Sequence, residues 1–331
     1  MIAIYEARFT GTGKYVPKKI LNNYDLEKML DTSDEWIKTR TGMFERRIAD
    51  PSEASSDLAY EASKIAIQAA GLKPKDIDMI IVGTISPDHL FPSTACILQK
   101  KLGTKNCPAF DISAGCTGFV YAASIGHQFV VTGKAKNVLV VGVEILSRIT
   151  NWDDRGTAVL FGDGSGAAVI SRTEPTSISK IIDFDMSADG TFGDLLIIQA
   201  GGSRMPPTME TVRDNKHTLY MEGNKIFKLA VRSMQESAET LLHRNRLDIR
   251  SIDWLIPHQA NLRIIESLGK KLNIDLEKVI VTIDKYANTS SSTIPIALDD
   301  AIRSNKIRHG DLVLLVAFGA GLTWGGILFR Y

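Results

Sequence analysis

Cysteine is scarce in this chain, whose 331 residues include three: Cys96, Cys107 and Cys116. Three cysteines cannot all pair with one another, and none stands in a Cys-x-x-Cys pair or in a Cys/His cluster with metal spacing. The sequence therefore gives no sign of a disulfide framework, and we expect no metal site. A reducing compartment fits this composition best.

The chain also lacks a large excess of charge of one sign, and it lacks long apolar runs. The formal net charge of +1 argues against a general nucleic-acid binder, although it leaves room for a local basic patch. The longest apolar run, residues 312–322, is far shorter than the roughly 20 residues that cross a bilayer. The first eight residues include Glu6 and no long apolar core, which argues against a signal peptide. We expect a cytoplasmic protein that binds neither nucleic acid nor membrane.

The chain does contain an internal repeat. Residues 77–81 match residues 252–256, and residues 137–141 match residues 311–315, both at a shift of about 175 residues. The apolar run that begins at residue 137 is typical of a strand covered on both faces. The pattern predicts an α/β fold made of two similar halves. We place these halves at residues 1–175 and 176–331.

Cys116 lies in a glycine-lined turn between a predicted buried strand, 108–112, and helix-like sequence from Val120. Gly115 and Gly118 let the backbone turn sharply and let another molecule approach it. A sulfur at the first turn of a helix faces unpaired N–H groups, which favours its thiolate. Cys116 is therefore the candidate nucleophile. The other two cysteines lack flanking glycines and are expected in the core: Cys96 and Cys107.

Two further polar residues are predicted to meet Cys116. Among six histidines, His258 stands apart because it directly follows a predicted buried strand, 254–257. Ligands gather at the carboxyl ends of such strands. The repeat, with two residues of slippage, places residues 286–292 opposite the Cys116 turn. This segment carries Asn288, whose amide can donate hydrogen bonds.

Four ordered motifs resemble those of β-ketoacyl-acyl-carrier-protein synthase III. They are Ala114-Gly115-Cys116-Thr117-Gly118-Phe119, Pro257-His258-Gln259-Ala260-Asn261, Ala287-Asn288-Thr289-Ser290 and Phe318-Gly319-Ala320-Gly321-Leu322-Thr323-Trp324-Gly325. The resemblance extends from Trp36 to the C-terminus. It implies a thiolase-like five-layered αβαβα fold made of two duplicated α/β halves, and it implies a homodimer.

The resemblance also implies an acyltransferase that starts fatty-acid chains by decarboxylative condensation. Cys116 would accept an acyl group from acyl-coenzyme A, with acetyl-coenzyme A as the expected primer. His258 and Asn288 would donate hydrogen bonds to the thioester oxygen of malonyl-acyl carrier protein, and the backbone N–H groups of Cys116 and Ala320 would hold a second oxyanion. The products would be 3-oxoacyl-acyl carrier protein, carbon dioxide and coenzyme A. No cofactor is bound permanently on this reading, since coenzyme A and the carrier's phosphopantetheine arrive with the substrates.

The same resemblance assigns binding surfaces. Coenzyme A would contact Thr32, Trp36, Arg40, Arg155, Gly223 and Asn261. The acidic acyl carrier protein would dock on Gln259, Ala260, Asn261, Leu262, Arg263, Lys228, Lys270 and Lys271. Phe91 would reach into the acyl pocket of the partner subunit.

Several alternatives stay open. A related enzyme could use the same sulfur to make a β-diketide, a quinolone precursor or an ester. A non-catalytic subunit could bind acyl-acyl carrier protein or acyl-coenzyme A, and a cysteine hydrolase would release a free acid. A biosynthetic thiolase is disfavoured because no cysteine follows Cys116, and an elongating synthase because Asn288 stands where a second histidine would be required.

Overall fold

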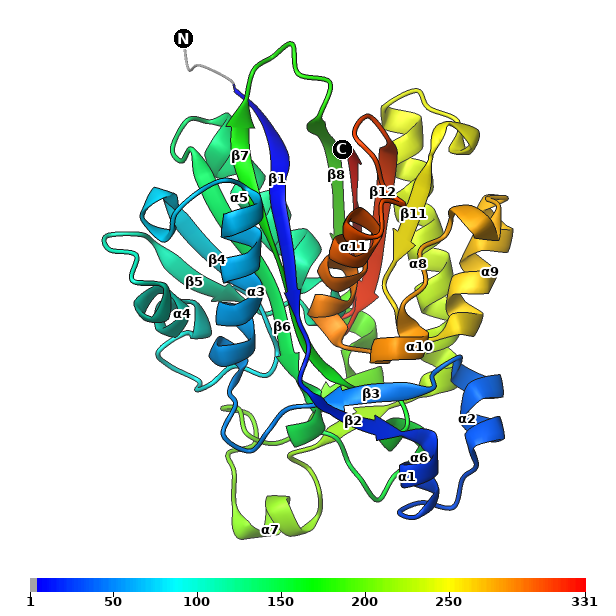
Figure 1. Cartoon of the computed structure of the whole chain (residues 1–331). Coiled ribbons are helices and arrows are strands. Elements are labelled where there is room, and N and C mark those ends of the chain that lie inside the picture. Colours follow the sequence, from blue (N-terminus) through cyan, green and yellow to red (C-terminus); the bar gives the residue numbers. More distant parts are fainter. Residues whose placement is uncertain (1–4) are drawn as a thin grey trace.

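The computed structural model describes residues 5–331, which fold around two β-sheets (Figure 1). The first sheet has the strand order β1-β7-β6-β4-β5, and the second has the order β11-β12-β13-β8. The strands of the first are β1 Glu6–Tyr15, β7 Asp163–Thr173, β6 Asn137–Ile145, β4 Met79–Gly83 and β5 Ala109–Ile112. The strands of the second are β11 Trp254–Pro257, β12 Leu312–Gly319, β13 Thr323–Arg330 and β8 Lys180–Ala188. Residues 1–4, half of the segment that argues against a signal peptide, lie outside the described part.

The two sheets repeat one pairing pattern. In the first, β4 runs parallel to β6, which is antiparallel to β7, which is antiparallel to β1. In the second, β11, β12, β13 and β8 pair in the same succession. The sequence repeat corresponds to β4 with β11 and β6 with β12. The edge strand β5 has no counterpart in the second sheet, and its residues are half-buried rather than buried as predicted.

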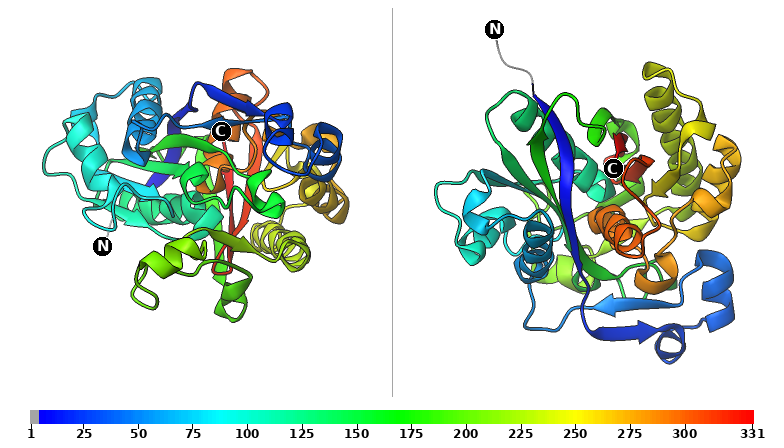
Figure 2. Two further views of the ribbon diagram at one scale, coloured as in Figure 1. Left: turned by 90° about the horizontal axis from the view of Figure 1, so that it is seen from below. Right: turned by 45° about the horizontal axis from the view of Figure 1, so that its top comes forward.

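Helices cover both sheets and fill the space between them, as Figure 2 shows from two further directions. One apolar cluster joins the two middle helices to the inner faces of both sheets, and two others join the outer helices to the outer faces. The result is an α-β-α-β-α stack. The middle helices are α5 Gly118–Val131 and α11 Thr293–Arg303, and the outer ones are α3 Ser55–Ala69, α4 Thr94–Leu102, α8 Gly223–Arg244 and α9 Leu262–Leu272.

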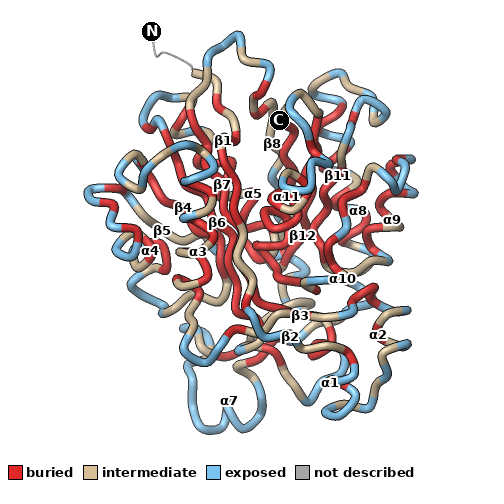
Figure 3. Tube along the Cα trace, in the orientation of Figure 1, coloured by how far each residue is buried: buried red, intermediate tan, exposed pale blue. Residues whose placement is uncertain are grey.

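The central strands β6 and β12 are buried along their whole length (Figure 3). Each of them packs against a short 3-10 turn from the other half of the repeat. The turn η2, Gly115–Thr117, contacts β12, and the turn η7, Ser290–Ser292, contacts β6. The two turns also contact each other. This crossed packing brings chemistry from both halves of the repeat to the middle layer.

Smaller elements surround this stack. A two-stranded antiparallel sheet of β2 Lys19–Asn22 and β3 Glu45–Ile48 packs beside α1 Asn23–Glu27, α2 Asp34–Thr41 and α10 Ile283–Tyr286. A second two-stranded antiparallel sheet pairs β9 Leu196–Ile198 with β10 Leu219–Met221; α7 Met209–Arg213 lies between these strands in the chain, and α6 Arg155–Ala158 contacts β10. None of the helices within residues 5–331 is both long and apolar enough to span a bilayer.

Candidate active site

A cavity of about 660 Å³ brings together the three residues that the sequence singled out, Cys116, His258 and Asn288. Cys116 sits in η2, at the start of α5. His258 directly follows β11, and Asn288 directly precedes Thr289 and η7. Two of the residues therefore come from the matching turns of the repeat, and the third comes from the carboxyl end of a strand, where ligands gather in open sheets.

The Cys116 turn meets the end of β12 in direct backbone contact. A Cβ atom at Gly319 would lie 2.4 Å from the Cys116 nitrogen, and one at Gly115 would lie 2.7 Å from the Ala320 nitrogen. Gly115 also has φ of +55°, which disfavours any residue with a side chain. Within residues 5–331, neither the Cys116 N–H nor the Ala320 N–H donates a hydrogen bond to a protein acceptor. Both stay free to bind an oxygen at this cavity.

Burial governs the protonation of the Cys116 sulfur. It raises the pKa of the thiol to about 12; a hydrogen bond from Ser290 opposes the rise and the charge of Glu144 adds to it. The expectation that the helix start favours a thiolate is therefore wrong for the substrate-free site. The cost of burying a charge outweighs the attraction of the free N–H groups. The resting nucleophile is a neutral thiol.

The imidazole of His258 is also neutral. Its side chain is 2% exposed, and burial lowers its pKa to about 3. Its Nδ1 atom lies 2.6 Å from Oγ1 of Thr293. The Thr293 hydroxyl has two acceptors within reach, Nδ1 and the Ser290 carbonyl at 3.0 Å. The Ser290 carbonyl already accepts from the Thr293 backbone N–H, so the hydroxyl proton can go to Nδ1. That arrangement leaves the proton on Nε2, and His258 can act as a neutral hydrogen-bond donor.

The amide of Asn288 is oriented by its own turn. Its Oδ1 atom accepts a hydrogen bond from the Ser290 backbone N–H at 2.8 Å. The amide nitrogen is therefore left to donate, and Asn288 lines the same cavity as Cys116. The chain conformation that permits this includes Ala287 at φ +55° and ψ −156°, a region that essentially only glycine enters freely.

Sequence reasoning missed a group of polar residues behind the cavity. The fully buried carboxyl of Glu144 accepts hydrogen bonds from the hydroxyls of Ser290 and Ser291, at 3.1 and 2.9 Å. Thr293, beside His258, also went unnoticed. The available signal was an acid at the end of an otherwise apolar buried strand, 137–145, together with the hydroxyl-rich run 289–293.

The residues predicted to bind coenzyme A lie around the mouth of the cavity. Trp36, Arg40, Gly223 and Asn261 line it. The Arg155 guanidinium stacks over the Trp36 ring, 4.7 Å from its centroid. The hydroxyl of Thr32 is buried and has no partner among the described residues. These positions offer one planar stack, cationic groups and one unused hydroxyl.

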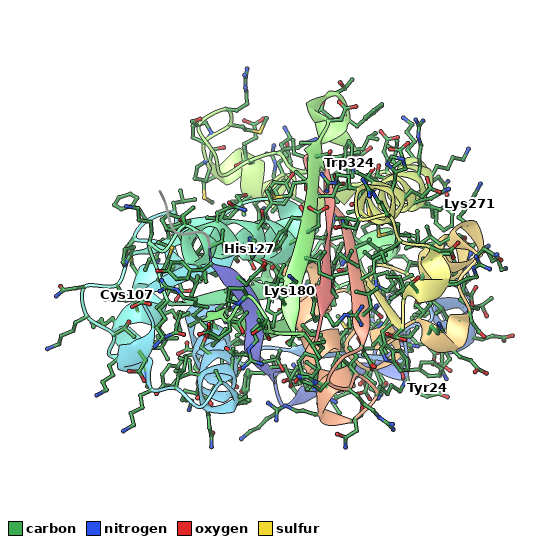
Figure 4. All side chains as sticks on the ribbon, turned by 90° about the horizontal axis from the view of Figure 1, so that it is seen from above. Tyr24, Cys107, His127, Lys180, Lys271 and Trp324 are labelled. Atoms are coloured by element: carbon green, nitrogen blue, oxygen red, sulfur yellow. The ribbon has the colours of Figure 1, made fainter. Side chains whose placement is uncertain are left out.

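Most of the predicted carrier-protein contacts lie near the same mouth. Lys228, Ala260, Asn261 and Arg263 line the cavity, and the exposed Lys270 and Lys271 follow on α9. Figure 4 shows Lys271 on the opposite side of the molecule from Cys107. Leu262 is partly buried against the cluster that includes Ile37 and Met43.

The prediction that Gln259 contacts the acyl carrier protein is wrong. Its side chain is 1% exposed and turns inward, donating to the Pro257 and Ile280 carbonyls and accepting from the Thr282 N–H. It is therefore not available to a docking protein. Every polar atom of its amide group is already used to tie the His258 segment to the chain before α10.

The remaining predicted residues divide into exposed and buried groups. Phe91 is 86% exposed and lines neither of the cavities that contain Cys116. Cys107 is buried as predicted, but Cys96 is exposed, because it lies on the solvent side of α4. Within residues 5–331, no group of three or more His, Cys, Asp or Glu side chains could hold a metal ion.

Comparisons with known proteins agree with this geometry. Residues 110–190 match the family model of 3-oxoacyl-[acyl-carrier-protein (ACP)] synthase III, and residues 242–331 match that of its C-terminal part. A β-ketoacyl-[acyl-carrier-protein] synthase III of Caldanaerobacter subterraneus subsp. tengcongensis is 57% identical over 98% of both chains, and one of Clostridioides difficile is 51% identical over 98% of both.

The crystal structure of 3-oxoacyl-[acyl-carrier-protein] synthase III from Aquifex aeolicus VF5 is 48% identical, with a TM-score of 0.91. The match covers 98% of this chain and 100% of that one. The predicted thiolase-like α/β fold is thereby confirmed. This chain belongs to the β-ketoacyl-[acyl-carrier-protein] synthase III family.

Proposed function

We propose that this chain catalyses the decarboxylative condensation of an acyl-coenzyme A primer, acetyl-coenzyme A first, with malonyl-acyl carrier protein. The products are 3-oxoacyl-acyl carrier protein, carbon dioxide and coenzyme A, and the reaction starts fatty-acid synthesis in the cytoplasm. The observation that carries the proposal is one cavity lined by a thiol, a neutral imidazole and an amide nitrogen free to donate.

The first half-reaction moves the acyl group to Cys116. The sulfur attacks the thioester carbonyl of the primer, and the free N–H groups of Cys116 and Ala320 hold the oxyanion that forms. When the carbon–sulfur bond of the primer breaks, the departing coenzyme A thiolate takes up the proton that Cys116 loses. An acyl-Cys116 thioester and free coenzyme A result, which divides one difficult step into two easier ones.

The second half-reaction forms the carbon–carbon bond. Malonyl-acyl carrier protein enters with its thioester oxygen facing Nε2–H of His258 and the amide of Asn288. Loss of carbon dioxide leaves an enolate, which these two neutral donors stabilise by roughly 3 to 4 kcal/mol each in a site without water. The enolate carbon attacks the acyl carbonyl, the carbon–sulfur bond to Cys116 breaks, and the released Cys116 thiolate takes up one proton from the solvent.

The mouth of the cavity suits both substrates. Trp36 and Arg155, already stacked on each other, would cover the adenine, and Arg40 would meet the phosphates. The pantetheine would pass Thr32, Gly223 and Asn261. The basic side chains of Arg263, Lys228, Lys270 and Lys271 would attract the acidic carrier protein.

We also propose that the chain forms a homodimer and consists of two similar halves. We place the N-terminal half, with the nucleophile, at residues 1–175 and the C-terminal half, with the histidine and the asparagine, at residues 176–331. A homodimer would bury Phe91, whose ring is almost fully exposed in the single chain. Its neighbour Leu90 is 87% exposed as well, and adjacent exposed apolar side chains are typical of an interaction surface.

The test is transfer of a labelled acetyl group. Radiolabelled acetyl-coenzyme A should label the wild-type protein at Cys116, located by mass spectrometry of the peptide, and should not label Cys116→Ala. Addition of malonyl-acyl carrier protein should release the label as 3-oxobutanoyl-acyl carrier protein. Failure of the wild type to take up label, equal labelling of Cys116→Ala, or release of free acetate would contradict the proposal.

A second cavity supports an alternative function, a related synthase that uses a longer acyl primer. A space of about 250 Å³ continues from Cys116 and Ala320 and is lined mainly by aliphatic side chains. A single water molecule occupies roughly 30 Å³ in the liquid, and a methyl group is of similar size. The cavity is therefore several times larger than the methyl group of an acetyl primer. A synthase with a longer primer in specialised metabolism would use this space, and a panel of acyl-coenzyme A donors of increasing length distinguishes the two.

A further inference from the structure

Two threonine side chains join the turn that carries Cys116 to the end of the second sheet. Thr117 follows the nucleophile in η2, and Thr323 begins β13. Their hydroxyl oxygens lie 2.6 Å apart, so one of the two hydroxyls donates a hydrogen bond to the other. Thr117 is fully buried, and Thr323 is half-buried. None of the steps above uses either hydroxyl.

Both hydroxyls also face backbone carbonyls beside the two free N–H groups of the cavity. The Thr323 oxygen lies 2.9 Å from the Ala114 carbonyl and 3.1 Å from the Ala320 carbonyl. The Thr117 oxygen lies 2.5 Å from the Ala114 carbonyl, which also accepts from the Thr117 backbone N–H at 3.2 Å. Ala114 precedes the Gly115–Cys116 peptide, and the Ala320 carbonyl follows the Ala320 N–H. The pair therefore holds the chain next to both N–H groups.

The two hydroxyl protons can be arranged in two ways. If Thr117 donates to Thr323, the Thr323 proton goes to the carbonyl of Ala114 or of Ala320. If Thr323 donates to Thr117, the Thr117 proton goes to the Ala114 carbonyl. The contact between the hydroxyls is a hydrogen bond in both arrangements. Among residues 5–331, no other group donates to the Ala320 carbonyl, so only the first arrangement can satisfy it.

The Thr323 hydroxyl makes every direct hydrogen bond between residues 113–119 and residues 318–324 in the described part of the chain. The rest of this contact is close backbone packing at Gly115 and Gly319. Glycine restrains the backbone least, and both turns contain one at positive φ, Gly115 at +55° and Gly321 at +138°. The distance between the two turns therefore depends on the Thr323 side chain.

That distance matters for acyl transfer because the two N–H groups come from opposite halves of the repeat. Each has to lie about 2.7 to 3.1 Å from the same oxyanion. No covalent bond between the Cys116 turn and the Ala320 turn fixes their separation. A displacement of about 1 Å at a reacting centre can lower a rate by about 10²-fold.

We propose that Thr323 is a positioning residue for acyl transfer, whose hydroxyl holds the Ala320 turn against the Cys116 turn so that the two free N–H groups bind one oxyanion. Thr117 completes the link from within η2. Neither threonine lines the two cavities that contain Cys116, so neither acts by touching the substrate. The role deepens the proposed condensation and rests on acyl transfer to Cys116.

The test compares acetyl transfer from acetyl-coenzyme A to Cys116 in single-turnover experiments, followed by mass spectrometry of the Cys116 peptide. Valine at residue 323 keeps the branched shape of threonine and lacks the hydroxyl. We expect Thr323→Val to lower the saturating rate at least tenfold, with the half-saturating concentration within threefold, and Thr323→Ser to recover at least a third of the wild-type rate. Equal rates in Thr323→Val and the wild type, or no recovery in Thr323→Ser, would overturn the proposal.

Alkylation of Cys116 with iodoacetamide separates the spacing of the N–H groups from the reactivity of the sulfur, because displacement of iodide forms no oxyanion. We expect Thr323→Val to be alkylated within threefold of the wild-type rate. An alkylation rate that falls as much as acetyl transfer would mean that the substitution disturbs the sulfur itself, which contradicts the proposal.

Thr12→Val is the matched control. Thr12 is a 5% exposed strand residue whose hydroxyl also joins two elements, donating to Asp299 at 2.9 Å, but it lines neither cavity that contains Cys116. Acetyl transfer in this variant should stay within threefold of the wild type. A loss equal to that of Thr323→Val would show that removing any buried hydroxyl has the same effect, and it would count against positioning.

If Thr323→Val does not fold, Thr117→Val serves instead and should show the same tenfold loss of acetyl transfer with alkylation preserved. Where both fold, the double variant should lose at most threefold more than Thr323→Val, because the two hydroxyls form one link. Losses that multiply would show that the two threonines act independently and would refute the link.

An activated ester separates this role from the proposed function. p-Nitrophenyl acetate transfers its acetyl group to the sulfur and releases p-nitrophenol without the coenzyme A contacts. The expected order of rates at Cys116 is the same: wild type, Thr323→Ser, Thr323→Val. This order with the ester, combined with no transfer from acetyl-coenzyme A to the wild type, would contradict only the proposed function. Equal rates of the three proteins with the ester would contradict the positioning role.

Discussion

The Nδ1 atom of His258 lies 2.6 Å from the hydroxyl oxygen of Thr293, and the direction of this hydrogen bond sets which ring nitrogen carries the proton. His258 ends a strand of the second sheet, while Thr293 begins the helix α11 in the middle layer. Because the imidazole is buried and neutral, its usefulness as a donor depends on this one neighbour. A hydroxyl outside the substrate's reach therefore sets the chemistry of a group within it.

Thr293→Val should lower kcat by roughly 10- to 100-fold, because valine keeps the shape of threonine but cannot donate to Nδ1. Acylation of Cys116 should suffer less than condensation, and KM should change little. Thr289→Val is the matched control, since the Thr289 hydroxyl is buried in the same turn without a hydrogen-bond partner among the described residues. Steady-state kinetics of both variants decides, and equal losses would show that packing, not the proton, is responsible.

Asn288→Asp should reduce decarboxylation of malonyl-acyl carrier protein by roughly 10²- to 10³-fold. The aspartate oxygen can still accept from the Ser290 N–H, so the turn should keep its shape, but the donors that face the enolate are gone and a negative charge replaces them. Release of labelled carbon dioxide measures the effect. Asn288→Ala removes the donors without adding charge, and a loss confined to Asn288→Asp would show that repulsion alone is at work.

The stability of the protein should fall as the pH drops from about 6.5 toward 3, in part through His258. Its pKa is about 3 in the folded chain, below the ordinary value near 6.5. The unfolded chain binds the proton first, so this contribution to stability is complete above pH 6.5 and is lost at up to about 1.4 kcal/mol per pH unit below it. Urea unfolding of wild type and His258→Gln across this range should show a shallower slope for the variant, and parallel slopes would count against a buried neutral imidazole.

Ala287→Gly should stabilise the protein by about 1 kcal/mol. The φ of +55° and ψ of −156° at Ala287 cost roughly 1 to 3 kcal/mol for a residue with a Cβ, and glycine removes most of this cost while adding up to about 1 kcal/mol of chain entropy. Urea unfolding at pH 7 measures the change. Ala301→Gly, in the regular helix α11, should destabilise, and a loss of stability in both variants would refute strain at Ala287.

Arg263→Glu should raise the KM for malonyl-acyl carrier protein at least tenfold at low salt, because it reverses a charge at the mouth of the cavity. The effect should shrink as salt is added, while the rate of acetyl transfer from coenzyme A should change less. Arg250→Glu is the control, since Arg250 is exposed and paired with its own neighbour Asp248. Carrier-protein KM values that move equally in the two variants would remove Arg263 from the docking surface.

Much of the fold and the centre of the site could be predicted because they follow from local patterns. The apolar runs of β6 and β12 and the spacing of the repeat indicate buried strands in two similar sheets. A strand-end histidine and a turn between glycines are visible in a few residues of sequence each. Cys116, His258 and Asn288 could therefore be named without coordinates.

The remaining features could not be predicted, because they depend on contacts between segments that are far apart in the sequence. The exposure of Cys96 follows from the side of α4 on which it falls, and the inward turn of Gln259 follows from three hydrogen bonds to distant segments. The pKa of Cys116 depends on burial, which raises it, and on local N–H groups, which lower it, and the effect of burial is the larger one. The outcome of such opposing effects can be determined only from the folded structure.

The backbone contact between Gly319 and Cys116 has a consequence for synthesis on the ribosome. The nucleophile is translated first, and β12, the strand that contacts its turn, follows it far later in the chain. A nascent chain that has finished its first sheet would still hold a thiol without an oxyanion site, so acyl transfer should become possible only when β12 and β13 have docked on the Cys116 turn.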